Sequence, residues 1–299
     1  MSPEWQIGRE GDIARLGATL AQGDHTVLAD ERRTGKTTVA LAALELLAND
    51  EKNLIVAVDL SRAVHDGKTL DEAVAVQVAA QRSVMARGAR QAGNLALRLW
   101  NLVRTAGWVE SDEGQTIDAA VQELRAAAER GDRGWALEAA VALAGENGGR
   151  AIVFIDEAQQ LDGLNDREEV AAELLARMRE PEAPVTFLFA GSEPSLVKTL
   201  FTKGGLLEFD AHDFPLSPID PQPWREGLRR AFRALDAEIT TRAVDLILEA
   251  TDGHPHRTML VANRGHEEAE FAHEAVVDEA LADVAVRTAK ESRLWDPRQ

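Results

Sequence analysis

The sequence predicts an α/β protein built on a parallel sheet. Short apolar runs alternate with longer segments of helical periodicity, and the runs at 54–58 and 151–155 contain no polar residue. Such continuous runs are typical of strands buried on both faces, as in parallel sheets with helical crossovers. With 299 residues, of which 45% are hydrophobic, the chain is long enough for one large α/β domain and a small appendage.

Composition excludes several classes of function. The chain has no cysteine, so disulfides, zinc–thiolate sites and thiol catalysis are excluded. Its 33 basic and 51 acidic residues give a net charge of −18, which argues against indiscriminate binding to nucleic acids. Because we find neither a secretory leader nor an apolar run of membrane length, we expect a soluble cytoplasmic protein that does not enter a membrane.

A phosphate-binding loop is predicted between the first strand, at 26–29, and the helix that follows it. The pattern GxxxxGK[ST] is met at Gly35, Lys36 and Thr37. Its first glycine falls on Asp30, which tolerates unusual dihedral angles but brings a negative charge toward a phosphate. The residues expected to bind the nucleotide are Arg32, Arg33, Thr34, Gly35, Lys36, Thr37 and Thr38.

The strand at 151–155 ends in two carboxylates. Asp156 is a candidate magnesium ligand together with the hydroxyl of Thr37, because Mg²⁺ prefers hard oxygen ligands. Glu157 is the candidate group that orients and deprotonates the attacking water. The alternative is an ordinary turn that ends a strand.

The strand at 185–190 ends in Gly191 and Ser192. A small polar side chain at this edge of the sheet would lie between the phosphate loop and the carboxylates, where it could sense the γ-phosphate or its water. The alternative is that Ser192 caps the helix that begins near Pro194, and both roles are compatible.

A helical insertion is predicted at about 61–149, because this part of the chain shows helical periodicity and no strand signal. Residues 73–109 contain no acid but five arginines. This stretch is either a surface that faces an anion or a partner, or a set of solvated arginines on helix faces.

The last part of the chain is predicted to be helical. A final strand is expected within 206–214, a linker at 215–223, and then four helices without strands. Gly253 and Pro255 suit a corner between two of these helices, and this corner could aim His256 or Arg257 at the nucleotide. We therefore expect a core at 1–218 and a helical lid at 219–299.

The ordered set of motifs resembles a known family. Gly8-Arg9-Glu10, the Arg32–Thr37 loop, the strand ending in Asp156-Glu157, Ala190-Gly191-Ser192 and Gly253-His254-Pro255 are similar to motifs of the AAA+/STAND-like P-loop ATPases. Within that class they resemble the archaeal-type ATPases related to the replication-initiator clade. The resemblance covers most of the chain, and least of all the insertion.

The resemblance implies a five-stranded parallel sheet of order 5-1-4-3-2, an insertion and a lid, with ATP and Mg²⁺ as ligands. Lys36 would hold the β- and γ-phosphates, and Ser192 and Arg257 would act as sensors in the core and the lid. Gly8 and Arg9 would lie by the nucleotide, and Lys203 would replace the intersubunit arginine finger. A winged-helix module does not fit after the lid, so DNA binding, if present, would use another surface.

Two hypotheses follow. The first is an ATPase that hydrolyses slowly and acts as a molecular switch on a partner protein or nucleic-acid complex, through the insertion or the lid, with self-association left open. The second is a non-hydrolysing nucleotide-binding scaffold, a hypothesis suggested by the degenerate loop at Asp30.

Overall fold

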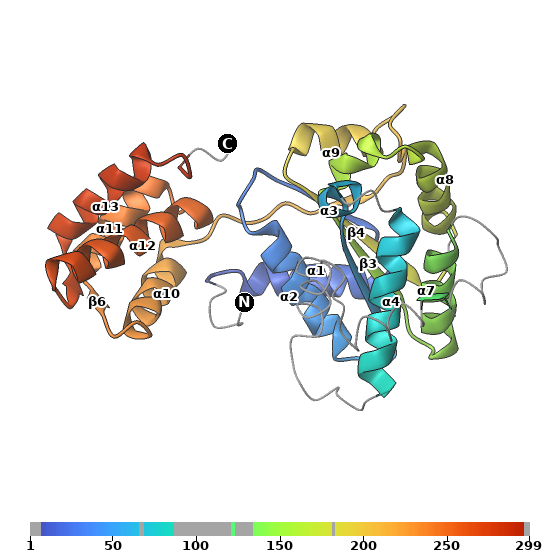
Figure 1. The fold of residues 1–299 in the computed structure, drawn as a ribbon, viewed down its shortest axis with the longest axis horizontal. Coiled ribbons are helices and arrows are strands. Elements are labelled where there is room, and N and C mark those ends of the chain that lie inside the picture. Colours follow the sequence, from blue (N-terminus) through green and yellow to red (C-terminus); the bar gives the residue numbers. More distant parts are fainter. Residues whose placement is uncertain (1–6, 66–68, 87–120, 123–133, 181–182, 296–299) are drawn as a thin grey trace. The chain divides into compact units, whose positions relative to one another are not determined.

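The chain forms two compact units in the computed structural model (Figure 1). The structure describes residues 7–65, 69–86, 121–122, 134–180 and 183–295. The larger unit contains Ile13–Asp30 and Thr37–Pro215, and the smaller contains Met1–Asp12, Glu31–Lys36 and Leu216–Gln299. The predicted boundary between residues 218 and 219 stays a prediction.

The larger unit is built on a parallel sheet of five strands in the order β2-β3-β4-β1-β5, which confirms the predicted order. The strands are β1 (Thr26–Ala29), β2 (Leu54–Asp59), β3 (Ala151–Asp156), β4 (Val185–Gly191) and β5 (His212–Asp213). All residues of β3 and β4 are buried, Asp156 and Thr186 among them, as expected of strands that are covered on both faces. Because the strands are parallel, their carboxyl ends lie at one edge of the sheet.

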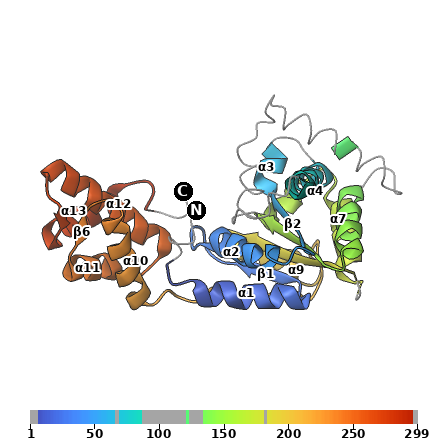
Figure 2. The same ribbon diagram turned by 90° about the horizontal axis from the view of Figure 1, so that it is seen from below.

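Helices cover both faces of this sheet. The helices in the described parts of the larger unit are α1 (Glu10–Gln22, which starts in the smaller unit), α2 (Lys36–Ala48), α3 (Leu60–His65), α4 (Leu70–Ala86), α7 (Trp135–Glu146), η3 (Ala158–Gly163), α8 (Arg167–Met178) and α9 (Pro194–Phe201). One apolar cluster joins α4, α7 and α8 to alternate residues of β2, β3 and β4. Gly17 of α1 packs against Leu46 and Ala43 of α2, and Figure 2 shows α1 and α4 on opposite sides of the sheet.

The insertion lies only partly within the described residues. There it contributes α3, α4 and α7, and no strand, between residues 61 and 149. Asp71 of α4 accepts hydrogen bonds from the amides of Gly134 and Ala136, so the first turn of α7 is held against α4. Most of the acid-free stretch, and with it the interpretation of its arginines, lies outside the described residues.

The helical part of the smaller unit contains α10 (Pro221–Arg233), α11 (Thr241–Thr251), α12 (Pro255–Ala272) and α13 (Glu279–Glu291). They surround an apolar cluster that includes Trp224, Phe232 and Ile247, and Ile7 from the start of the chain joins this cluster. A Cβ on Gly227 would stand 2.5 Å from Ile7, so the glycine permits α10 to approach the N-terminal segment closely.

The prediction of a lid without strands is wrong in detail. Two short strands, β6 (Glu238–Ile239) and β7 (Val276–Val277), pair in parallel. A pair of two residues on each side gives no periodic signal in a sequence. The helix α12 is continuous through Gly265. Gly265 lies in the helix interior, with Val277 and Ala285 close to where its Cβ would be.

We expect from the sequence that the protein does not enter a membrane, and the length and apolarity of its helices bear on that expectation. None of the helices in the described parts of the chain is both long and apolar enough to cross a membrane.

Candidate active site

The loop at Asp30–Thr38 connects β1 to α2, which begins at Lys36. Its residues with positive φ are Arg33, at 64°, and Gly35, at 96°. Asp30, which stands in place of the first glycine of the motif, does not adopt a positive φ. The backbone of this loop therefore does not need glycine at position 30. Any effect of Asp30 on nucleotide binding would come from its charge and not from the backbone conformation.

The loop is closed by hydrogen bonds to its own backbone. Lys36 is 6% exposed, and its Nζ donates to the carbonyl of Glu31 at 2.5 Å. The hydroxyl of Thr34 donates to the same carbonyl at 3.0 Å. Two donors thus converge on one carbonyl, which keeps the segment from Glu31 to Lys36 compact.

Five polar residues of the larger unit form what we call the carboxylate cluster: Thr37, Asp156, Glu157, Gln159 and Ser192. Thr37 lies in the first turn of α2, Asp156 ends β3, and Ser192 follows β4. The hydroxyl of Thr37 donates to Asp156 Oδ2 at 2.7 Å, and the amide of Glu157 donates to Asp156 Oδ1 at 3.0 Å. The predicted pair of magnesium ligands is therefore in direct contact.

The environment of Asp156 disfavours its charge. Burial raises the pKa of this carboxyl to about 6, and the neighbouring carboxylates of Glu157 and Asp59 raise it as well, while the hydrogen bond from Thr37 lowers it. Asp59 is the neighbour of Asp156 in the register of β2 and β3. A buried carboxylate with two acidic neighbours is favourable for a divalent cation, which would offset most of their negative charge.

Ser192 contacts Glu157. The Ser192 hydroxyl donates to Glu157 Oε2 at 2.8 Å, and Gln159 donates to the same oxygen. Ser192 is not the N-cap of α9, because Glu193 occupies that position. Sequence reasoning includes Gln159 in the motif that follows β3 but assigns it no role.

Comparison with solved structures identifies the fold. A Walker-type ATPase of Pyrococcus abyssi superposes with a TM-score of 0.62 and 17% identity, over 95% of this chain and 73% of that protein. The ORC2 protein of Aeropyrum pernix, solved as ADPNP–ADP complexes, superposes with a TM-score of 0.58 and 16% identity, over 97% and 69%. The RuvB Holliday junction branch migration motor of Thermotoga maritima gives 0.51 and 14%, over 94% and 70%.

The chain has the fold of the AAA+ P-loop ATPases. Neither a family model nor a curated protein matches its sequence. At 14–17% identity the likeness concerns the fold alone, so the roles of individual residues rest on their geometry.

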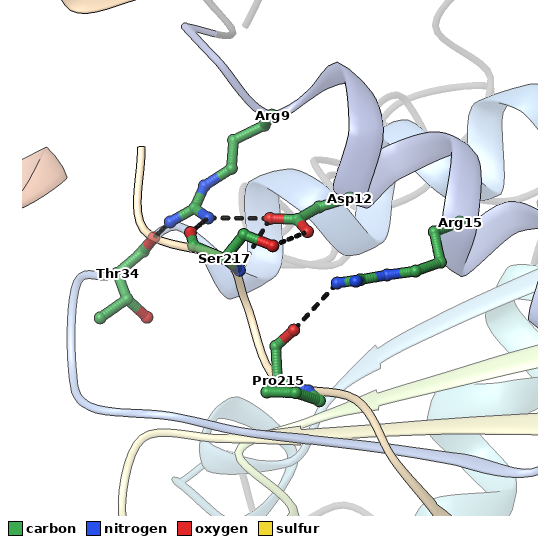
Figure 3. A network of polar contacts seen from close by, with 6 residues as sticks. All are labelled: Arg9, Asp12, Arg15, Thr34, Pro215 and Ser217. Carbon is green, nitrogen blue, oxygen red and sulfur yellow. Dashed lines mark hydrogen bonds and ion pairs between the residues drawn. The ribbon is translucent and has the colours of Figure 1, made fainter. Parts of the chain in front are cut away.

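In the smaller unit of this AAA+ fold, Arg9 takes part in a partly buried network of polar contacts (Figure 3). We call Arg9, Asp12, Thr34 and Ser217 the arginine network. Arg9 pairs with Asp12 at 2.9 Å and donates to the carbonyls of Thr34, at 2.9 Å, and Ser217. Asp12 also accepts from the amide and hydroxyl of Ser217, at 3.2 and 3.0 Å.

The network gives Arg9 a structural role, and the prediction that Gly8 and Arg9 lie by the nucleotide stays a prediction. Arg9 is 7% exposed and uses its guanidinium to bind backbone, so the structure assigns its side chain to holding three chain segments together. Gly8 has a φ of 65°, and a Cβ there would stand 2.6 Å from Ile219. Sequence reasoning missed Asp12 and Ser217. The Arg-x-x-Asp spacing at a helix start was the available signal for Asp12.

The corner between α11 and α12 is built as the sequence indicates. Gly253 has a φ of 63°, Pro255 lies in the first turn of α12, and the His254 side chain caps that helix. Within the same unit, Arg33 contacts His256 at 2.9 Å and donates to the carbonyl of Leu294 at 3.1 Å. Burial lowers the pKa of His256, and Arg33 lowers it further, which favours a neutral ring at neutral pH.

Arg257 contacts the last described residue. Its Nε donates to the carbonyl of Trp295 at 3.3 Å, and its guanidinium lies over the Trp295 ring at 5.4 Å. Lys203, the candidate finger, is exposed two residues after α9. The roles predicted for Arg257 and Lys203 stay predictions.

Proposed function

We propose that this protein binds Mg²⁺-ATP at the Asp30–Thr38 loop and hydrolyses it slowly, as a molecular switch. The observation that carries the proposal is the carboxylate cluster. Thr37 and Asp156 are in contact at 2.7 Å, and Glu157 and Ser192 are in contact at 2.8 Å beside them. The AAA+ fold of the chain supports nucleotide binding at the level of the fold.

The residues present fit a magnesium ion. Thr37 and Asp156 would supply two hard oxygens, and waters and phosphate oxygens would complete the coordination. In the described parts of the chain no group of three or more acidic, histidine or cysteine side chains forms a metal cage of its own. That arrangement suits Mg²⁺ bound through its substrate, since this ion keeps several waters and needs few protein ligands. The ion would supply charge neutralisation at the phosphates.

Glu157 would act as the general base. Its carboxylate would accept a proton from a water molecule while the water oxygen forms a bond to the γ-phosphorus. The bond from that phosphorus to the bridging oxygen breaks, and ADP and inorganic phosphate leave. Ser192 would hold Glu157 in place by its hydrogen bond. Lys36 would contribute a point charge at the β- and γ-phosphates.

The second candidate function, a non-hydrolysing scaffold, rests on Asp30. Since Asp30 does not occupy a position of positive φ, its cost is electrostatic and not conformational. A carboxylate at about 4 Å from a phosphate charge costs on the order of 1 kcal/mol in water. That cost weakens binding without removing the residues needed for hydrolysis, so we favour the ATPase.

The partner is proposed as a class. Two proteins of similar fold are a branch migration motor for Holliday junctions and an ORC2 protein. A nucleic-acid complex or a protein within one is therefore the partner we propose, reached through the insertion or the lid. Self-association, with Lys203 as the residue contributed to a neighbouring subunit, belongs to the same proposal.

Phosphate release and nucleotide affinity test the proposal. Glu157→Gln keeps the shape of the side chain but removes the base, and we expect a loss in kcat of about 10²–10⁴ with ATP still bound. For Lys36→Ala we expect affinity to fall by about tenfold or more, because a charge-assisted contact is lost. Equal phosphate release by the wild type and both variants would contradict the proposed ATPase activity. Tight binding of Mg²⁺-ATP without turnover would instead support the scaffold.

A further inference from the structure

Glu157 is held in an unusual backbone conformation. It directly follows β3, is the N-cap of η3, and has a φ of 53°, in the left-handed region. A residue with a Cβ rarely adopts this region, and such strain is found where surrounding contacts impose it. The contacts that fix its side chain are therefore the ones to identify.

Gln159 reaches back from η3 to the same carboxylate. Its Nε2 donates to Glu157 Oε2 and lies 3.4 Å from the Ser192 hydroxyl, which itself donates to that oxygen. A carboxylate oxygen only accepts hydrogen bonds, so the nitrogen of the Gln159 amide, and not its oxygen, must face Glu157. Two donors from two elements thus converge on one oxygen.

The amide of Gln159 occupies this place at a cost. Gln159 is 8% exposed, and its Oε1 is buried without a hydrogen-bond partner in the described part of the chain. An unsatisfied buried acceptor destabilises the folded state. Gly191, at the end of β4, makes room for it, because a Cβ there would stand 2.4 Å from Oε1. Stability therefore does not explain the presence of this side chain.

We infer that Gln159 is a positioning residue for the Glu157 carboxylate. Together with Ser192 it fixes Oε2, and among the described residues no donor reaches Glu157 Oε1, which is left to accept the proton of the attacking water. The inference rests on the proposed hydrolysis and assigns to it a residue that acts through Glu157 and not on the nucleotide.

The test is steady-state hydrolysis by Gln159→Met. Methionine keeps the length of the side chain but removes both the donor and the unsatisfied acceptor, so the fold has no reason to lose stability. Misplacement of a catalytic group lowers turnover, and we expect a fall in kcat of about 10–100-fold with the KM for ATP within about twofold. The matched control is Gln160→Met, the adjacent glutamine on η3, for which we expect the kcat of the wild type.

A double-mutant cycle with Ser192→Ala separates positioning from a structural role. If both residues act on one oxygen, the double variant is at most about threefold slower than the slower single variant. Losses that multiply would show that Gln159 acts elsewhere. The inference is also overturned if Gln159→Met has wild-type kcat, or if its loss is accompanied by an equal loss of affinity or thermal stability.

The activity of the wild-type protein distinguishes a failure of this inference from a failure of the proposed hydrolysis. If the wild type hydrolyses ATP and the Gln159→Met variant is equally active, this inference alone is contradicted. A wild type that is no faster than Lys36→Ala and Glu157→Gln removes the proposed hydrolysis and the inference with it.

Discussion

Asp12 and Asp156 are buried to the same degree, with 5% and 6% of their surface exposed, but their neighbours differ in charge. Asp12 pairs with Arg9 at 2.9 Å and accepts two further hydrogen bonds from Ser217. The charged groups that act on Asp156 are the carboxylates of Glu157 and Asp59. The arginine network satisfies its charge within the protein, whereas the carboxylate cluster keeps a charge that a bound cation would satisfy.

The difference indicates which of the two regions serves stability and which serves function. A buried ion pair with hydrogen bonds to several segments holds those segments together, and breaking it leaves a charge without a partner. A buried carboxylate among acids destabilises the free protein and prepares it for a ligand. Removing a charge is therefore expected to destabilise the protein in the arginine network and to stabilise it in the carboxylate cluster.

The largest effect is expected for Arg9→Ala. Removing one partner of a buried ion pair costs about 3–5 kcal/mol, because Asp12 would stay buried without a cation. Denaturant unfolding measures this loss. In Arg9→Met/Asp12→Leu both charges are absent, and we expect most of the stability to return. A cost below about 1 kcal/mol for Arg9→Ala would contradict the role of the network.

Asp156→Asn is expected to stabilise the protein. Because burial raises the pKa of Asp156 from 3.8 to about 6, the folded state holds this proton more tightly than the unfolded state does, and the stability that the group contributes falls as pH rises from about 4 to 6. At pH 8 without nucleotide the variant should gain about 1–3 kcal/mol.

The pH dependence provides the check on that prediction. The gain should be smaller at pH 5.5 than at pH 8, because wild-type Asp156 is then partly protonated. Phosphate release by the variant should fall by about a hundredfold or more, since a proposed metal ligand is lost. A variant less stable than the wild type at pH 8 would remove the contrast between the two regions.

A smaller effect is expected for Ser217→Ala. The variant loses the hydroxyl that donates to Asp12 Oδ1 at 3.0 Å but keeps the ion pair and the backbone amide donor. The expected cost is about 1 kcal/mol, measured by denaturant unfolding. Ser195→Ala, at an exposed serine of α9, is the control and should lie near the wild type.

The smallest effect concerns Asp30. If its carboxylate repels the phosphates, Asp30→Asn should bind Mg²⁺-ATP about fivefold more tightly, which corresponds to about 1 kcal/mol. The gain should shrink as salt is added, because salt screens exposed charges. Equal affinity of the two proteins at low salt would show that Asp30 does not act on the nucleotide.

The sheet could be predicted because buried parallel strands consist almost entirely of apolar residues. The runs that became β2, β3 and β4 are apolar except for Thr186 and the closing Asp59 and Asp156, and each ends within a residue of the predicted position. Asp156 and Ser192 were found because parallel strands place their carboxyl ends at one edge. The pair β6 and β7 was missed because two residues are too few for a periodic pattern.

The sequence by itself determined the α/β class, the phosphate loop and the polar residues at the strand ends, because these depend on local composition and spacing. The tertiary structure decided which of those residues meet. Ser217 reaches Asp12 and Arg9 across more than 200 residues, and Gln159 reaches Glu157 only because Gly191 leaves room for its amide. Contacts of this kind depend on packing between distant segments, which no local pattern in a single sequence encodes.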